Sequence, residues 1–247
     1  NKFSRGFKKL IFFWGADHYG YIGRLKAGSI ALGYKKEQID IIIMQMVRLM
    51  QAGQEVKMSK RSGIYVTIDE LIDEVGIDVA RFFFLTRSSD TQFNFDLDLA
   101  KEQSEKNPVY YVQYAYARIH SILAKSKIQN SKTELPITEA KVKKRVKPSS
   151  PSKITIKNSK LLTHSSELNL IKQLIRLPEA MEDTAKDYQV QRLPQYAQEL
   201  ATVFHQFYRD CKILSEAEGL QDARLSLVLA TKIVLKNILG LMGISAP

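Results

Sequence analysis

Apolar residues recur at three- and four-residue intervals through most of the last third of the chain, and this period constrains the fold more than any other feature. Each segment with this pattern predicts an amphipathic helix, which must bury its apolar stripe against another element. The segments are residues 168–187 (LNLIKQLIRLPEAMEDTAKD), 193–214 (LPQYAQELATVFHQFYRDCKIL) and 222–243 (DARLSLVLATKIVLKNILGLMG). Together with the aromatic-rich helix expected over residues 107–124, they predict an all-α bundle over residues 107–247.

Residues 1–106 differ in texture, because short apolar runs alternate with glycines and helical patterns, as in an α/β domain. Residues 8–17 (KKLIFFWGAD) predict a buried strand that ends at a glycine, and residues 18–33 predict a helix. Apolar and β-branched residues on both sides of the turn QAGQ predict a hairpin over residues 39–59.

Two short helices are expected after this hairpin. Thr67 with Glu70 three residues later has the spacing of a capping box, so a helix is predicted to begin there and to stop at Gly76. Asp78 is expected to cap the second helix, which covers residues 78–88.

The formal net charge of +11 comes mainly from one segment. Residues 125–160 hold eleven of the 37 Lys and Arg residues, two of the 26 Asp and Glu residues and three of the seven prolines. Without lasting periodicity, this segment is predicted to be a flexible basic insert in the helical domain. Two roles remain open for it, a solvated loop and salt-sensitive contact with an RNA backbone.

The single cysteine, Cys211, excludes a disulfide framework and a thiolate zinc cluster, and it fits a reducing compartment. It is expected in the core, and no metal site is expected because the histidines lack ligand spacing. Apolar runs such as residues 39–47 are too short to cross a bilayer, and the start of the chain lacks a signal-peptide pattern. We therefore expect a cytoplasmic protein without a membrane partner.

The string EVKMSKRSG at residues 55–63 is a candidate phosphate-binding loop. Lys57 and Lys60 lie three residues apart, so that both ammonium groups can reach one polyphosphate, and Ser59 can add a donor. From residue types alone, an exposed basic turn remains the commoner explanation of such a string.

A second candidate is WGADHYG at residues 14–20. Gly15 lets a ligand approach the backbone at the end of a strand, and Asp17 can accept hydrogen bonds from the two hydroxyls of a ribose. His18 begins the next helix and would line the pocket that holds the adenosine to which this ribose belongs. The alternative for Asp17 is a cap of the helix that it precedes.

Aromatic and basic residues in two of the expected helices are candidates for RNA contact, because rings stack on unpaired bases and arginine pairs with phosphate. Aromatic residues at helical spacing also build cores, and we divide the candidates accordingly. The expected core residues are Tyr111, Tyr114, Phe204 and Phe207. The expected RNA contacts are Tyr110, Gln113, Arg118, His205, Tyr208 and Arg209.

The string KMSKR at residues 57–61 resembles the KMSKS signature of class I aminoacyl-tRNA synthetases at four of its five positions. The remainder of the chain, except the basic insert, is similar to arginyl-tRNA synthetases, most clearly at residues 14–27, 64–100, 107–119 and 222–247. The resemblance implies the C-terminal half of a class I Rossmann-like catalytic domain over residues 1–106. It implies a helical anticodon-binding domain of the DALR type over residues 107–247.

This resemblance implies ligation of L-arginine to tRNA(Arg) with ATP and Mg²⁺. Lys60 would stabilise the β- and γ-phosphates of ATP while the arginine carboxylate attacks the α-phosphorus, and Lys57 would support the same charge. Met58, Ser59, Gly15, Asp17 and His18 would contact ATP. Arg61 replaces the final serine of the signature, and its role stays open.

A complete class I synthetase also carries an H-x-G-H motif, which the four histidines of the chain, His18, His120, His164 and His205, do not form. We therefore expect a monomeric C-terminal fragment that supplies the KMSKR loop and anticodon recognition but cannot form arginyl adenylate alone. Two alternatives remain, a stand-alone tRNA-binding module without catalysis and a cysteinyl-type synthetase.

Overall fold

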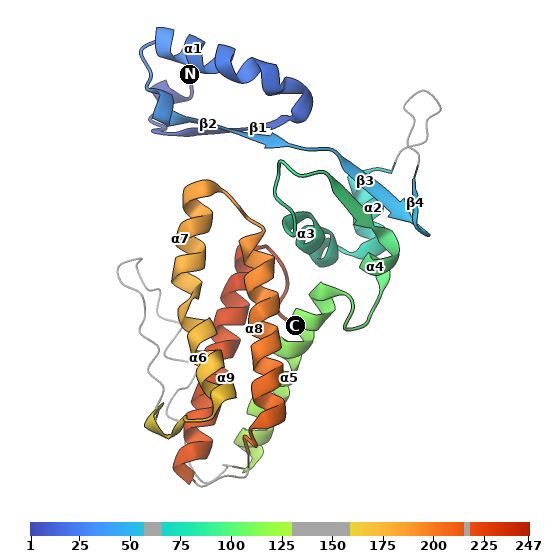
Figure 1. The fold of residues 1–247 in the computed structure, drawn as a ribbon, viewed down its shortest axis with the longest axis vertical. Helices are drawn as coiled ribbons and strands as arrows, with labels where there is room; N and C mark the ends of the chain where they lie inside the picture. The colour runs from blue at the N-terminus through green and yellow to red at the C-terminus, as the bar shows by residue number, and fades with distance from the viewer. Residues whose placement is uncertain (57–65, 130–158, 215–217) are drawn as a thin grey trace. The chain divides into compact units, whose positions relative to one another are not determined.

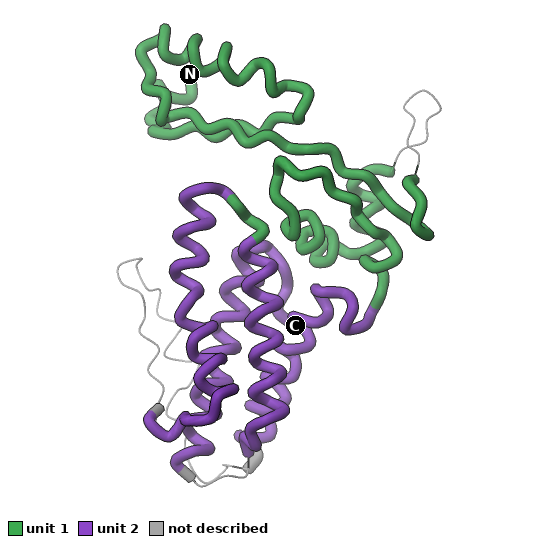
Figure 2. The backbone as a smooth tube through the Cα atoms, viewed as in Figure 1, with its two compact units in different colours: residues 1–102, 189–191 green, residues 103–188, 192–247 purple. Residues whose placement is uncertain are grey.

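The computed structural model describes residues 1–56, 66–129, 159–214 and 218–247. The chain forms two compact units, which Figure 2 shows in different colours. Unit 1 comprises residues 1–102 and 189–191, and unit 2 comprises residues 103–188 and 192–247. Within the described ranges, no helix combines the length and the apolar character that crossing a bilayer requires.

Unit 1 begins with a strand–helix–strand arrangement in which both strands run in the same direction (Figure 1). Strand β1 (Leu10–Gly15) leads into a 3-10 helix, η2 (Ala16–Tyr21), then helix α1 (Ile22–Ala31) and strand β2 (Ile39–Met44). The prediction of a buried strand was wrong for β1, because alternate residues are exposed and the Phe13 side chain keeps 67% of its surface. The expected helix at residues 18–33 is α1, preceded by η2.

A second sheet has the strand order β4–β3–β5. Strand β3 (Val47–Gln51) is antiparallel to β4 (Gln54–Glu55) and parallel to β5 (Phe93–Asp96). The hairpin prediction was therefore correct for β3 and β4 and wrong for β2, which pairs with β1 instead. At the junction, the backbone N–H of Gln45 donates to the Ser89 carbonyl at 2.7 Å, outside both ladders.

The two short helices of unit 1 meet at Gly76. The cap of α2 (Ile68–Val75) is confirmed, because Thr67 Oγ1 accepts from the Glu70 N–H at 3.1 Å and Glu70 Oε2 accepts from the Thr67 N–H at 2.7 Å. Helix α3 (Ile77–Leu85) begins directly after Gly76, which is its N-cap. The prediction for Asp78 was wrong, because this residue already lies in the first turn of α3.

Phenylalanine rings form the core of unit 1 between α3 and β5. Phe83 lies 5.4 Å from Phe95 between ring centroids, and Phe82 and Phe95 are completely buried. A short helix, α4 (Leu97–Lys101), follows β5 and packs against α2 and β3.

Unit 2 is the all-α bundle that the apolar periodicity predicts (Figure 1). Its helices are α5 (Pro108–Gln129), α6 (Ser165–Ile175), α7 (Leu177–Asp187), α8 (Arg192–Asp210) and α9 (Glu218–Leu241). The long helices α5, α8 and α9 pack pairwise against one another. Fully buried side chains in their shared core include Val112, Ile119, Leu200, Phe204, Phe207, Leu227 and Leu235.

Two expected boundaries in unit 2 were wrong. The pattern at residues 168–187 forms two helices with a break at Arg176, because Pro178 lacks an N–H and disfavours a continuing helix before it. Helix α5 extends to Gln129, so the first residues of the expected insert at 125–160 are helical, and residues 130–158 lie outside the described ranges. Cys211 is buried as expected, one residue after α8 ends.

Candidate nucleic-acid interface

A groove of about 780 Å³ lies between the C-terminal half of α5 and the end of α8. We call it the α5–α8 groove. It is open to solvent, and the buried apolar residues Ile122 and Ile213 are part of its lining. The aromatic and basic residues that line it are Tyr114, Arg118, Lys125, Tyr208, Arg209 and Lys212.

Arg118 joins two tyrosine rings at the edge of this groove. Its guanidinium carbon lies 4.6 Å from the centroid of the Tyr114 ring and 4.7 Å from the centroid of the Tyr208 ring. Arg118 Nη2 also donates a hydrogen bond to the Tyr114 hydroxyl. Tyr114 was expected in the core, but it lines the groove and 47% of its surface is exposed.

Positive charge dominates the lining. Arg118, Lys125, Arg209 and Lys212 contribute cations, and the described residues of the lining include a single carboxylate, Asp210. Hydrogen bonds from Ser166 and then from Arg209 hold the pKa of Asp210 below its usual value, so this carboxylate is ionised at neutral pH. Exposed rings beside several cations suit a single-stranded nucleic acid, whose bases stack and whose phosphates pair with arginine and lysine.

Three of the six predicted RNA contacts, Arg118, Tyr208 and Arg209, line the groove. Gln113 does not, and its Nε2 donates to the Ser245 carbonyl at 3.2 Å. Tyr110 is half-buried on α5.

His205 lies behind the groove, with its ring centroid 5.0 Å from that of Tyr111 and 5.8 Å from that of Tyr114. Its Nε2 atom is buried without a hydrogen-bond partner. Burial lowers the pKa of His205, and the charge of Arg118 acts in the same direction. Of the expected core rings, Phe204 and Phe207 are fully buried, whereas Tyr111 is half-buried and its hydroxyl lies 3.3 Å from Thr202 Oγ1.

Sequence reasoning missed Tyr114, Lys125 and Lys212 as groove residues. A signal was available for Tyr114, because it lies four residues before Arg118, whereas Lys212 lies beyond the end of α8 at Asp210. Residues four apart share a helix face. Lys125 was assigned to the basic insert, and only the extension of α5 to Gln129 brings it to the groove.

Three of the predicted ATP contacts, Gly15, Asp17 and His18, lie at the carboxyl end of β1. A Cβ atom on Gly15 would lie 2.5 Å from Asp17 Oδ1, so the missing side chain leaves room for this carboxylate. Asp17 is exposed in the first turn of η2, with Oδ2 at 3.6 Å from His18 Nε2. The helix-cap alternative for Asp17 was wrong, because Gly15 caps η2 and Tyr21 caps α1. Lys57, Met58, Ser59, Lys60 and Arg61 lie outside the described residues.

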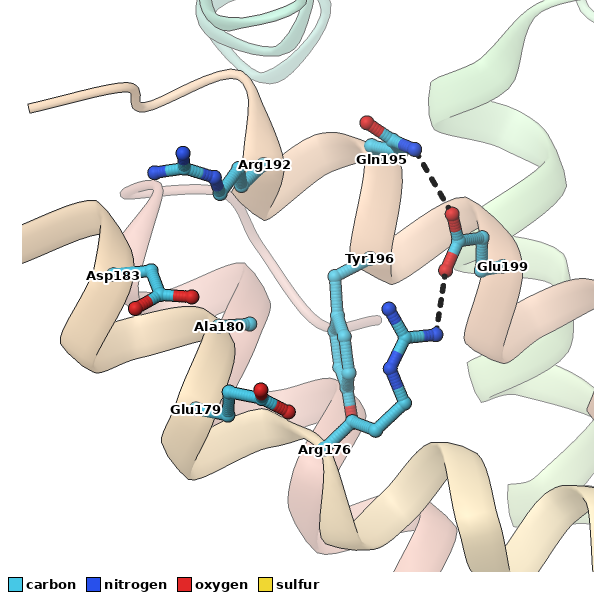
Figure 3. Close-up of a pocket in the computed structure, with 8 residues that line it drawn as sticks. All are labelled: Arg176, Glu179, Ala180, Asp183, Arg192, Gln195, Tyr196 and Glu199. Atoms are coloured by element: carbon cyan, nitrogen blue, oxygen red, sulfur yellow. Dashed lines mark hydrogen bonds and ion pairs between the residues drawn. The ribbon is translucent and has the colours of Figure 1, made fainter. Parts of the chain in front are cut away.

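A second, smaller pocket of about 280 Å³ lies between α7 and α8 (Figure 3). Arg176 is 3.4 Å from Glu199 across it, and Arg192 pairs with Asp187 at 2.6 Å. Burial raises the pKa of Tyr196, whose hydroxyl donates to the Gln173 carbonyl at 2.8 Å. Three carboxylates, of Glu179, Asp183 and Glu199, line it against two guanidinium groups, so this pocket does not favour a polyanion.

The helical bundle of unit 2 matches a known family of domains. The model of the DALR anticodon binding domain matches residues 112–247, and the chain belongs to this family. Over its whole length the chain is 46% identical to the arginine–tRNA ligase of Desulfitobacterium hafniense (strain DSM 10664 / DCB-2) and 45% identical to that of Moorella thermoacetica. It spans 41% of the length of each of these relatives.

Solved structures show the same likeness. A Campylobacter jejuni protein assigned as an arginyl-tRNA synthetase matches all of this chain at 32% identity with a TM-score of 0.80, over 49% of its own chain. The Thermus thermophilus arginyl-tRNA synthetase matches 97% of this chain at 22% identity with a TM-score of 0.71, over 41% of its own chain. The second likeness concerns the fold alone.

Proposed function

We propose that this chain is part of an arginine–tRNA ligase and that its helical unit binds the anticodon region of tRNA(Arg) in the α5–α8 groove. The observation that carries the proposal is Arg118, which lies over the rings of both Tyr114 and Tyr208 at the edge of a cationic groove. The names of the relatives favour arginine over cysteine as the amino acid.

An anticodon loop presents unpaired bases and closely spaced phosphates, and the groove offers a partner for each. Tyr208 is 40% exposed, so part of its ring is available to a base. Stacking of a base on an aromatic side chain contributes about 1–3 kcal/mol. Arg209, Lys125 and Lys212 are spaced along the walls and can pair with successive phosphates. The proposal therefore assigns stacking to the tyrosines and backbone contact to these cations.

We also propose that unit 1 is the C-terminal part of a class I Rossmann-like catalytic domain. The parallel arrangement β1–α1–β2 supports this, because a Rossmann-like sheet is built from such units. Ligands of such sheets bind outside the carboxyl ends of the strands. Gly15, Asp17 and His18 lie at that end of β1. The exposed apolar residues Ile11 and Phe13 on one face of β1 are typical of a parallel sheet that has a further layer on that face.

In the reaction of the whole enzyme, the carboxylate of L-arginine attacks the α-phosphorus of ATP and displaces pyrophosphate. A hydroxyl at the 3′ end of tRNA(Arg) then attacks the carbonyl of the arginyl adenylate and displaces AMP. The ATP that serves as a substrate is bound together with Mg²⁺. Asp17 would accept hydrogen bonds from the ribose hydroxyls, and Lys57 and Lys60 would neutralise charge that develops on the phosphates. In the full-length enzyme, Lys60→Ala should slow arginine activation strongly and leave tRNA affinity unchanged. An unchanged activation rate would remove Lys60 from this role.

The groove is tested by tRNA binding to the whole chain across a salt series, with a non-cognate tRNA for comparison. Tyr208→Ala should weaken binding by about 1–3 kcal/mol, roughly 5- to 150-fold, with the salt dependence unchanged. Arg209→Ala should lower the slope of log K against log salt by about 1. Arg192→Ala, at the opposite end of α8 and paired with Asp187, is the matched control. Wild-type binding by both groove variants would refute the groove as the RNA site.

A further inference from the structure

The N-terminus of α6 is tied to the end of α8 by a hydrogen bond between two side chains. Ser166 Oγ donates to Asp210 Oδ2 at 2.6 Å, and Ser166 itself is buried. The other oxygen of the same carboxylate, Asp210 Oδ1, accepts from Arg209 Nε at 2.9 Å. A buried hydroxyl on α6 therefore orients a carboxylate on α8, which in turn orients an arginine of the α5–α8 groove.

A buried ion pair fixes the position from which Ser166 acts. Arg224 Nε on α9 donates to Glu167 Oε1 at 2.7 Å, and Arg224 Nη1 donates to the Lys212 carbonyl at 3.0 Å. Glu167 Oε2 accepts from the His164 N–H at 2.9 Å. The first turn of α6, which includes Ser166, and the backbone at Lys212 are thus held by one guanidinium group.

The side chain of Arg209 is 73% exposed. An exposed arginine ordinarily samples many rotamers and loses that freedom when it binds a phosphate. The bond from Nε to Asp210 removes part of this freedom before any ligand arrives, and it leaves the two terminal nitrogens for a phosphate. Such pre-ordering raises affinity because less entropy is lost on binding.

We propose that Ser166 is a positioning residue for RNA binding, which acts through Asp210 on Arg209 and does not touch the RNA. The ligand class is the phosphodiester backbone of a single-stranded segment. The inference rests on the proposed function of the α5–α8 groove. It adds a residue of α6, a helix that contributes no side chain to the described lining of that groove.

The test uses the whole chain and measures both RNA binding and the state of Arg209. Ser166→Ala should weaken tRNA binding about 2- to 10-fold, the cost of ordering one free side chain. By NMR, the Arg209 Nε–H should exchange faster with water, and the pKa of Asp210 should rise toward its usual value. In an Arg209→Ala background, Ser166→Ala should have no further effect on binding. Ser226→Ala is the matched control, because its hydroxyl donates to the Asp222 carbonyl of its own helix.

Three results would overturn the proposal. The first is that Ser166→Ala keeps the wild-type tRNA affinity although its Arg209 Nε–H exchanges faster with water. The second is an effect of Ser166→Ala that persists in the Arg209→Ala background, which would mean that Ser166 acts through the fold. The third is wild-type binding by both Arg209→Ala and Tyr208→Ala, which would refute the groove and the positioning role together. In the first case, weaker binding by Arg209→Ala would keep the groove and refute the positioning role alone.

Discussion

The substitution Glu167→Gln tests how much the buried ion pair contributes to unit 2. Glu167 keeps 1% of its surface and Arg224 keeps 8%, so the change neutralises one partner of a pair that water hardly reaches. The amide has nearly the shape of the carboxylate, but its single oxygen cannot accept from both Arg224 Nε and the His164 N–H. Arg224 is left as a buried cation that still donates to the Lys212 carbonyl.

Breaking a buried pair at one partner costs about 3–5 kcal/mol, because the other charge stays buried without compensation. Since Gln can still accept one hydrogen bond, we expect a loss near 3 kcal/mol in the free energy of unfolding. At about 2–4 °C per kcal/mol for a chain of this size, the melting temperature of the helical transition should fall by roughly 6–12 °C.

The assay is urea unfolding followed by far-UV circular dichroism, with Glu182→Gln as the matched control. Glu182 on α7 has a side chain that is 73% exposed and lies 3.9 Å from Lys186, so its loss should cost about 0–0.5 kcal/mol. Replacing both buried partners, Glu167→Leu with Arg224→Met, should restore most of the stability. Equal losses in Glu167→Gln and Glu182→Gln would refute this account of the pair.

Three further predictions concern local features. In the β3–β4 turn Ala52 has φ +49° and Gly53 has φ +73°, so Ala52→Asn should stabilise unit 1 by about 0.5–1 kcal/mol in urea unfolding, and Ala52→Val should destabilise it. Thr67→Ala removes the cap of α2 and should cost about 1 kcal/mol by the same measurement. Hydrogen bonds to Thr67 lower the pKa of Glu70, so this pKa should rise in the variant when it is measured by NMR. Because the pKa of His205 is lowered in the folded state, the unfolded chain binds more protons below about pH 6.5, so the melting temperature should fall as pH decreases from 7.5 to 5. His205→Phe should reduce this fall, and an unchanged pH dependence would contradict the reasoning.

Helix positions could be predicted from the sequence because their signals are local. The Thr67–Glu70 spacing located the start of α2, and Gly76 located its end. The period of apolar residues located α8 and α9 within a few residues. Strand pairing could not be predicted in the same way, because β2 has the residue types of either partner strand, and a contact with β1 depends on residues some 30 positions away.

The predicted RNA contacts show the same difference between local signals and contacts that depend on helix packing. Arg118, Tyr208 and Arg209 were identified by residue type, and each lines the groove. Tyr114 was misassigned to the core, and His205, a predicted RNA contact, is half-buried and does not line the groove, because the cover of these faces of α5 and α8 depends on how the helices pack. Helical spacing shows which residues share a face and does not show whether that face meets a neighbour or solvent.

The sequence by itself determined the two kinds of architecture, the helices with their caps, and the resemblance that the family comparison confirmed. Only the tertiary structure showed that Arg118 lies over both tyrosine rings and that Ser166 reaches Asp210, 44 positions later, and Glu167 reaches Arg224, 57 positions later. The physical reason is the distance along the chain over which each kind of interaction acts. Backbone preferences act within a turn or two of the chain, whereas the partner of a buried charge or an exposed ring is decided by the packing of helices distant in sequence.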